Sequence, residues 1–158
     1  MVGIDRIIAE AGVAKATFYH HFKSKDELVT AYLTREYERQ RNALADVPGD
    51  GVERIEAIFG LLAVLSRGPG FRGCPFLNAA AEFADPSHAV RGVVDDYRGW
   101  FRDYMRELLG GRADAAAKAE FLLVMRDGVA VSGGLGDMGA IDAGVATALA
   151  VLEVPADA

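Results

Sequence analysis

Cysteine is nearly absent from this sequence, and its single cysteine, Cys74, excludes an intramolecular disulfide. The histidines and the cysteine show no zinc-ligand spacing, so we expect neither a metal site nor a cofactor. The longest apolar runs, such as residues 58–65 with Gly60 inside, are too short to cross a bilayer. The N-terminal segment carries Asp5 and lacks the apolar core of a signal peptide. These absences predict a cytoplasmic protein with no membrane partner.

An excess of basic residues is also lacking, because the 158-residue chain has a net charge of −6. Taken as a whole, this charge argues against nucleic-acid binding. The distribution of charge changes that conclusion. Residues 1–45 hold seven Lys or Arg against six Asp or Glu, whereas the remainder has a net charge of −7. Residues 13–25 hold three lysines, two histidines and no acidic residue, so we expect a small positive patch on an acidic body.

The sequence also lacks the features of an enzyme. It contains no paired acid and base, no nucleophile elbow and no phosphate-binding loop. Glycines cluster at residues 133–139, but this segment lacks the strand and helix context that a nucleotide site requires. We therefore predict no enzymatic activity.

Strict alternation of polar and apolar residues is absent, so no strand is predicted and the chain is interpreted as all-α. Apolar residues instead recur at steps of three and four, which is the spacing of one helix face. The predicted helices cover residues 4–11, 14–22, 25–44, 51–65, 76–83, 86–109, 115–129 and 141–154. Glycine and proline make residues 67–75 the clearest loop.

Helix ends are marked by capping residues. Gly12 is expected at the end of the first predicted helix, in the left-handed conformation. Ser24 and Glu27 form a capping box, in which both side chains accept hydrogen bonds from backbone N–H groups. The capping role is also expected of Asp50, Asp85 and Asp114. Val13, in the turn between the first two predicted helices, is expected to be buried, as are Phe18 and Phe22 of the second helix.

Small residues are concentrated in the last two predicted helices, where glycine inside a helix costs about 1 kcal/mol relative to alanine. One interpretation is that two helices approach each other closely there. The other is that residues 132–139 form a flexible loop. The sequence leaves both interpretations open.

One segment carries a resemblance to a known family. Residues 4–33, IDRIIAEAGVAKATFYHHFKSKDELVTAYL, resemble the DNA-binding head of the TetR family of bacterial transcriptional regulators. Residues 73–83, GCPFLNAAAEF, resemble a segment of the regulatory domain in one branch of that family. The resemblance implies a homodimeric regulator, usually a repressor, whose C-terminal helices bind a small-molecule effector and thereby move two DNA-binding heads apart.

The resemblance also implies a division into two domains. Residues 1–45 would form the helix-turn-helix head with its connecting helix, and residues 46–158 would form a helical bundle for effector binding and dimerisation. The last two helices of each subunit would build a four-helix dimer interface. The two heads would then read half-sites of a pseudo-palindromic operator, about 34 to 36 Å apart.

The second helix would be the recognition helix in the major groove of double-stranded DNA. The residues that match DNA-contacting positions of the family are Lys15, Ala16, Thr17, Tyr19, His20, His21 and Lys25. The first three would meet base edges or nearby phosphates, the next three the DNA backbone, and Lys25 a phosphate. The paired histidines are alternatively plain surface or half-buried residues. We expect no metal site there, because no third metal ligand lies nearby in the sequence.

An effector pocket needs polar groups that converge among apolar walls. The residues that we predict to bind the effector are Phe59, Leu62, Cys74, Phe76, Asn78, Tyr97, Trp100, Tyr104 and Met125, with Arg126 as a further polar candidate. Most of the apolar ones also suit an ordinary core. Cys74 is alternatively a sensor of electrophiles or oxidants, although no cation adjoins it within the tripeptide Gly73-Cys74-Pro75.

The sequence departs from the family at its start. Family members carry a further helix before the helix-turn-helix, whereas here Met1 falls just before the second helix of that pattern. We expect that the natural protein is longer. The alternative is a ligand-binding helical protein that has lost DNA binding together with this helix.

Overall fold

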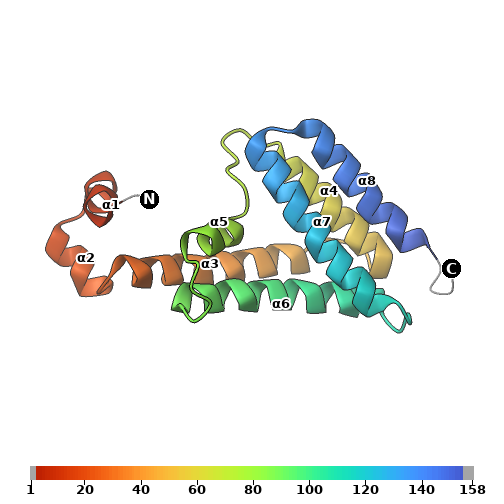
Figure 1. Ribbon diagram of the computed structural model, residues 1–158, viewed down its shortest axis with the longest axis horizontal. Coiled ribbons are helices and arrows are strands. Elements are labelled where there is room, and N and C mark those ends of the chain that lie inside the picture. Colours follow the sequence, from red (N-terminus) through yellow and green to blue (C-terminus); the bar gives the residue numbers. More distant parts are fainter. Residues whose placement is uncertain (1–2, 155–158) are drawn as a thin grey trace.

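The computed structural model describes residues 3–154, and these residues form helices and loops without a strand. The helices are α1 (Ile4–Ala11), α2 (Lys15–His21), α3 (Lys25–Ala45), α4 (Gly51–Ser66), α5 (Pro75–Glu82), α6 (Ala89–Leu109), α7 (Ala115–Leu135) and α8 (Met138–Glu153). Figure 1 shows a small head of α1 and α2 at one end of the molecule and a larger helical body at the other. The all-α prediction is therefore confirmed.

The head follows the capping signals of the sequence. Gly12 ends α1 with a φ of 64°, in the left-handed region. The Ser24 hydroxyl accepts a hydrogen bond from the Glu27 N–H at 3.1 Å, and the Glu27 carboxylate accepts one from the Lys23 N–H. Both the glycine turn and the capping box are thus confirmed.

Burial in the head differs in part from the prediction. Phe18 is buried and Phe22 is half-buried, and their rings lie 5.7 Å apart. Val13, however, is 42% exposed, so the prediction that it packs inward is wrong. The reason is that α1 and α2 pack mainly against each other, and no other helix of residues 3–154 covers the turn between them.

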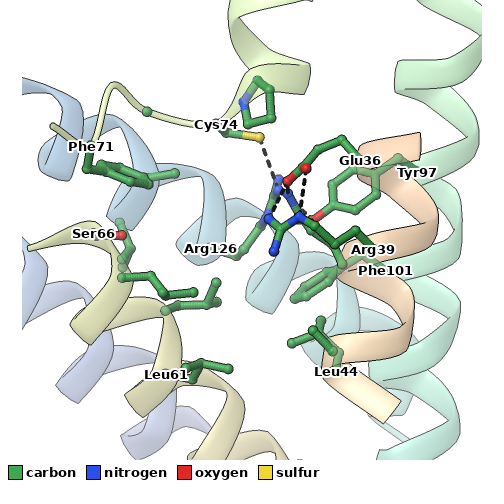
Figure 2. Close-up of a pocket in the computed structure, with 18 of the residues that line it drawn as sticks. Glu36, Arg39, Leu44, Leu61, Ser66, Phe71, Cys74, Tyr97, Phe101 and Arg126 are labelled. Atoms are coloured by element: carbon green, nitrogen blue, oxygen red, sulfur yellow. Dashed lines mark hydrogen bonds and ion pairs between the residues drawn. The ribbon is translucent and has the colours of Figure 1, made fainter. Parts of the chain in front are cut away.

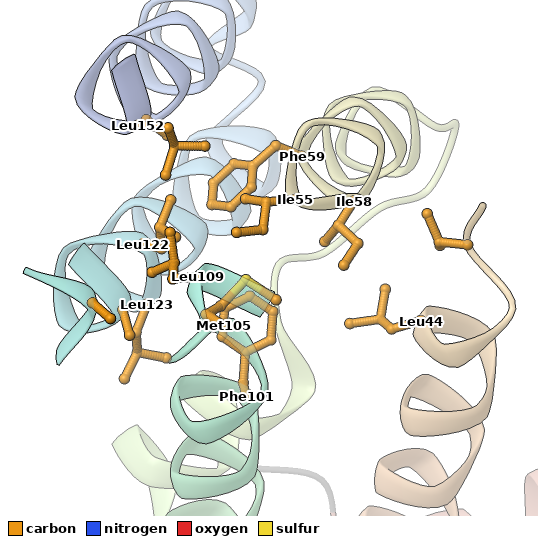
Figure 3. Packing of buried hydrophobic residues seen from close by; sticks show 14 residues of the cluster. Leu44, Ile55, Ile58, Phe59, Phe101, Met105, Leu109, Leu122, Leu123 and Leu152 are labelled. Carbon is orange, nitrogen blue, oxygen red and sulfur yellow. The ribbon is translucent and has the colours of Figure 1, made fainter. Parts of the chain in front are cut away.

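The body is built around α3 and α6, which run side by side in the same direction (Figure 1). Helices α4, α7 and α8 pack together at one end of this pair and enclose the main core with parts of α3 and α6. Figure 3 shows side chains of α3, α4, α6, α7 and α8 meeting in this core. Its fully buried members include Ile55, Ile58, Phe59, Phe101, Met105 and Leu122. Burying a side chain of this size stabilises the fold by about 1.5 to 3 kcal/mol.

Three predicted caps differ from the structure. Helix α6 begins at Ala89 rather than beside Asp85, because the Asp85 carboxylate already accepts hydrogen bonds from Ser87. His88 is the cap instead, and its Nδ1 accepts a hydrogen bond from the Val90 N–H at 3.2 Å. Asp50 and Asp114 do stand at helix starts, but neither side chain makes a capping hydrogen bond.

The glycine-rich segment near the end of the chain is largely helical. Helix α7 continues to Leu135, and α8 begins at Met138, so residues 132–139 are not a flexible loop. The close-approach interpretation is the correct one at Gly133. A Cβ atom there would lie 2.7 Å from the Ser66 carbonyl oxygen and 2.9 Å from Phe71. Only glycine lets α7 pass this close to the end of α4.

Within the part of the chain that the structure covers, no helix is long and apolar enough to span a membrane. No group of three His, Cys, Asp or Glu side chains in residues 3–154 is arranged to hold a metal ion.

We predict that Gly133→Ala lowers the free energy of unfolding by about 1 to 3 kcal/mol, because the added methyl overpacks the contact with Ser66. Urea unfolding at one fixed protein concentration measures this effect. Gly128→Ala, in the same helix, is the matched control, since a Cβ atom there meets nothing within 4 Å. An equal response of the two variants would contradict the close approach.

Candidate functional site

Helix α2 presents a continuous polar surface. The side chains of Lys15, Ala16, Thr17, Tyr19, His20 and His21 are all exposed, while Phe18 points into the head. The structure therefore brings six of the seven residues predicted to contact DNA onto one short helix. The side chain of Lys15 pairs with Asp5 of α1 at 2.9 Å, and this hydrogen bond raises the pKa of the lysine. The pair is well exposed, so a phosphate can readily replace the carboxylate.

The seventh residue, Lys25, lies at the start of α3 and is already engaged. Its ammonium group pairs at 2.7 Å with Glu82, the last residue of α5. The lysine side chain is only 20% exposed. The pairing with Glu82 could not be predicted from the sequence, because the two residues are 57 positions apart and no local pattern connects them.

A second polar contact ties the start of α3 to the body. The Nε2 atom of His88 lies 3.1 Å from a carboxylate oxygen of Asp26. Since Nδ1 of this histidine accepts the hydrogen bond that caps α6, the ring proton is on Nε2 and is donated to Asp26. The first turn of α3 is thus held by the ends of both α5 and α6.

A cavity of about 420 Å³ lies inside the body, bounded by α3, α4, α6, α7 and the loop before α5. Its size is typical of pockets for small organic ligands. Figure 2 shows polar side chains gathered beside Cys74 and Tyr97, and apolar ones such as Leu44 and Leu61 farther along the wall. The apolar lining includes Leu44, Leu61, Leu62, Leu65, Phe71, Phe101, Val129 and Ala130.

Four of the effector candidates line this cavity, namely Leu62, Cys74, Tyr97 and the further polar candidate Arg126. Two others are buried and do not line it. Phe59 is fully buried in the main core. Phe76 stacks on the Tyr97 ring, with 3.8 Å between the ring centroids, and so supports the wall without lining it.

The other four predicted effector residues point elsewhere. Trp100 and Tyr104 stack on each other, and the Tyr104 hydroxyl donates to the Leu44 carbonyl oxygen of α3. Met125 lies against Gly144 of α8. Asn78 is exposed and donates to the Arg72 carbonyl oxygen. These residues hold helices and the loop together, and composition alone does not distinguish that role from a lining role.

The contribution of α3 to the cavity was not predicted from the sequence. Tyr32, Glu36, Arg39, Gln40 and Ala43 of this helix all line it. Their steps of three and four place them on one helix face, which is a signal that the sequence did contain. The Glu36 carboxylate accepts hydrogen bonds from Arg39 and Gln40, and the first of these lowers its pKa.

Arg126 of α7 is the centre of the polar part of the cavity. Its side chain is only 4% exposed. Its guanidinium donates to the Asp127 carboxylate at 2.6 Å, to the Tyr97 hydroxyl at 2.8 Å and to the Cys74 sulfur at 3.1 Å (Figure 2 shows the sulfur contact). Tyr97 in turn donates to the amide oxygen of Gln40. Burial raises the pKa of Tyr97 to about 12, so its hydroxyl stays protonated.

The comparisons with known proteins agree with this arrangement. The family described as "Bacterial regulatory proteins, tetR family" matches residues 1–32. The structure of SCO4454, a TetR-family transcriptional regulator from Streptomyces coelicolor, is 39% identical to this chain. The match covers 97% of this chain and 86% of that one, with a TM-score of 0.85. This chain belongs to the TetR family. It is thus similar over nearly its whole length to a transcriptional regulator of that family.

Other members show the same fold at lower identity. A putative TetR-family regulator (sav143) from Streptomyces avermitilis is 27% identical, with 97% of this chain and 88% of that one covered and a TM-score of 0.82. The reduced form of NemR from Escherichia coli has a TM-score of 0.82 at 21% identity, covering 98% and 88%. In sequence, the transcriptional repressor NemR of Escherichia coli K12 is 28% identical over 99 residues. That alignment spans 60% of this chain and 50% of the relative.

We predict that Tyr97→Phe lowers the free energy of unfolding by about 1 to 3 kcal/mol. The substitution keeps the stacking on Phe76 but leaves donors of Arg126 and the oxygen of Gln40 without their buried partner. Urea unfolding measures the loss. Tyr104→Phe, which removes one longer hydrogen bond of 3.3 Å, is the control and should cost less. Equal losses would show that the Arg126 network adds no special stability.

Proposed function

We propose that this chain is a repressor that binds a pseudo-palindromic operator as a homodimer and leaves it when a small molecule occupies the cavity. The exposed side chains of α2 would read the major groove. Residues 1–45 would supply the DNA-binding head with its connecting helix, and residues 46–158 the effector and dimerisation functions. The relative NemR is named as a transcriptional repressor, which supports repression rather than activation as the role of this chain.

One observation carries this proposal: a single helix joins the two sites. Helix α3 has Lys25 at its first position, beside α2, and it has Glu36, Gln40 and Leu44 in the wall of the cavity. Because a helix of 21 residues behaves as a stiff rod, a ligand that displaces the cavity end of α3 also reorients the head.

Release would follow from a shift between two packing arrangements of α3. In the arrangement described here, the Lys25–Glu82 and His88–Asp26 contacts fix the first turn of α3 to α5 and α6. Helix α5 directly follows the loop that lines the cavity at Gly73 and Cys74. A ligand that moves this loop therefore acts on the same contacts that position the head.

Dimerisation would use α7 and α8. Val124, Gly128, Val131 and Leu135 are all exposed and follow steps of four and three, so they form one apolar stripe along α7. Exposed small residues on α8, among them Ala143 and Ala150, would let two helices approach closely. Pairing these faces between two copies would cover apolar surface that a single chain leaves in water.

A specific observation favours the alternative of a ligand-binding protein without DNA binding. The two lysines expected to contact DNA, Lys15 and Lys25, are both paired with carboxylates of the chain itself. An electrophoretic shift assay with the DNA adjoining the gene, repeated across salt concentrations, separates the two functions. An absence of binding even at low salt would favour the alternative.

We predict different effects for the two lysines in this assay. Lys25→Ala should weaken binding to all sequences and reduce the salt slope by about one, because it removes one phosphate contact. Lys15→Ala should relax the preference at one base position. Competition with single-base variants of the operator measures this preference. Equal discrimination by both variants would contradict the assignment of roles.

A further prediction concerns the partner of Lys25. Glu82→Gln should raise operator affinity about two- to fivefold at low salt, because the lysine no longer has to leave a carboxylate to reach a phosphate. Glu120→Gln, which removes an equal charge from a pair with Arg102 in the body, is the control and should have a smaller effect. Direct titration of labelled operator gives both affinities.

The Lys25→Ala background tests the mechanism of this effect. If Glu82 acts by holding the lysine, then Glu82→Gln should change nothing once Lys25 is alanine. An unchanged gain in that background would mean that Glu82 acts only through the overall charge of the protein.

A further inference from the structure

The buried cation in the wall of the cavity, Arg126, shares its only carboxylate partner in residues 3–154 with a second arginine. The Asp127 carboxylate is shared between two guanidinium groups, since one oxygen pairs with Arg126 and the other with Arg98. The Arg98 side chain is 30% exposed and lies outside the cavity lining, so Arg126 is the buried cation of the two. Glu36, which also lines the cavity, is paired with Arg39, so this pair adds no net charge. A buried charge that lacks a full counter-charge is costly, and an anion supplied from the cavity would relieve that cost.

Arg126 also has donors to offer to such an anion. A guanidinium has five N–H groups, and the contacts with Asp127, Tyr97 and Cys74 use three of them. The remaining two have no hydrogen-bond partner among the residues that the structure describes. Because Arg126 lines the cavity, a carboxylate that enters it meets a buried cation with unused donors, which is the setting of a strong charge-assisted hydrogen bond.

The rest of the cavity suits an apolar group. Beyond the polar cluster, its walls are formed by leucines of α3 and α4 together with Phe71 and Phe101 (Figure 2). With about 420 Å³ available, the cavity accommodates a short alkyl chain or an aromatic ring besides the head group. The occupant must therefore be polar at one end and apolar at the other.

We propose that the ligand of this cavity is a small amphipathic organic acid, whose carboxylate pairs with Arg126 while its hydrocarbon part lies along Leu44, Leu61 and Leu62. A neutral amide of the same shape would fill the apolar part but would offer Arg126 no counter-charge beyond the shared carboxylate of Asp127. The acid is thus selected by charge rather than by size. Its role as the effector rests on the function proposed above, whereas its binding does not.

The test measures binding to the full chain in the absence of DNA. Calorimetry and thermal unfolding are carried out with butyrate, hexanoate, octanoate and benzoate, each compared with its primary amide. At least one acid should bind about tenfold or more tightly than its amide and raise the unfolding temperature. If no acid is preferred over its amide, the inference is wrong. This comparison needs no variant, so it stands even where a variant fails to fold.

Variants then locate the site. Arg126→Gln should abolish the preference for the acid, whereas Arg102→Gln, a surface control on α6, should keep it. Leu61→Trp should weaken the binding of acid and amide alike by filling the apolar part of the cavity. Circular dichroism confirms that each variant is folded. A preference for the acid that survives in folded Arg126→Gln would overturn the assignment.

The operator assay separates this inference from the proposed function. If the acid binds in an Arg126-dependent way but leaves operator affinity unchanged, the inference about the ligand is correct and the proposed role of the acid as effector is wrong. If the protein binds the operator but prefers no acid over its amide, the inference about the ligand is wrong, while the proposed function as a DNA-binding regulator is supported.

Discussion

The buried guanidinium of Arg126 is the point at which the separate parts of the body are tied together. Through Tyr97 it connects α7 to α6, and through the bond from Tyr97 to Gln40 the connection continues to α3. Through Cys74 it reaches the loop that leads into α5. Apolar packing is tolerant of small sliding movements, but charge-assisted hydrogen bonds have preferred directions. Arg126 therefore fixes how four elements are placed relative to one another, and with them the shape of the cavity.

The sequence was most informative where the determinants are local. The turn at Gly12, the capping box at Ser24 and the apolar stripes of the long helices depend on residues within a few positions of one another, and they were predicted correctly. The prediction that Asp85 caps α6 was wrong, because Asp85 and His88 are both potential caps and the carboxylate of Asp85 is occupied by its hydrogen bonds from Ser87. The prediction that Val13 is buried was wrong, because burial depends on which parts of the chain pack against a residue, and no local pattern reveals them.

The site was predicted only in part, for the same reason. The exposed face of α2 could be found because its residues follow one another in the chain. The cavity combines residues from five parts of the chain, and aromatic content alone could not separate lining side chains from supporting ones. Cys74 and Tyr97 line it, whereas Trp100 and Tyr104 brace α6 against α3. The contribution of Glu36 and Gln40 was visible as a periodic polar face, but its meaning depended on knowing which helix lies opposite.

The length of α3 also sets the scale of any movement that it transmits. With a rise of 1.5 Å per residue, Lys25 lies about 22 Å along the axis from Gln40 in the cavity wall. A tilt of about 10° around Gln40 would then displace Lys25 sideways by about 4 Å. Two copies moving in opposite directions would change the separation of their heads by about 8 Å, roughly a quarter of one turn of DNA. In the dimer proposed above, a displacement of about 1 Å at Leu44, four residues beyond this pivot, would therefore be enough to put both heads out of register with adjacent major grooves.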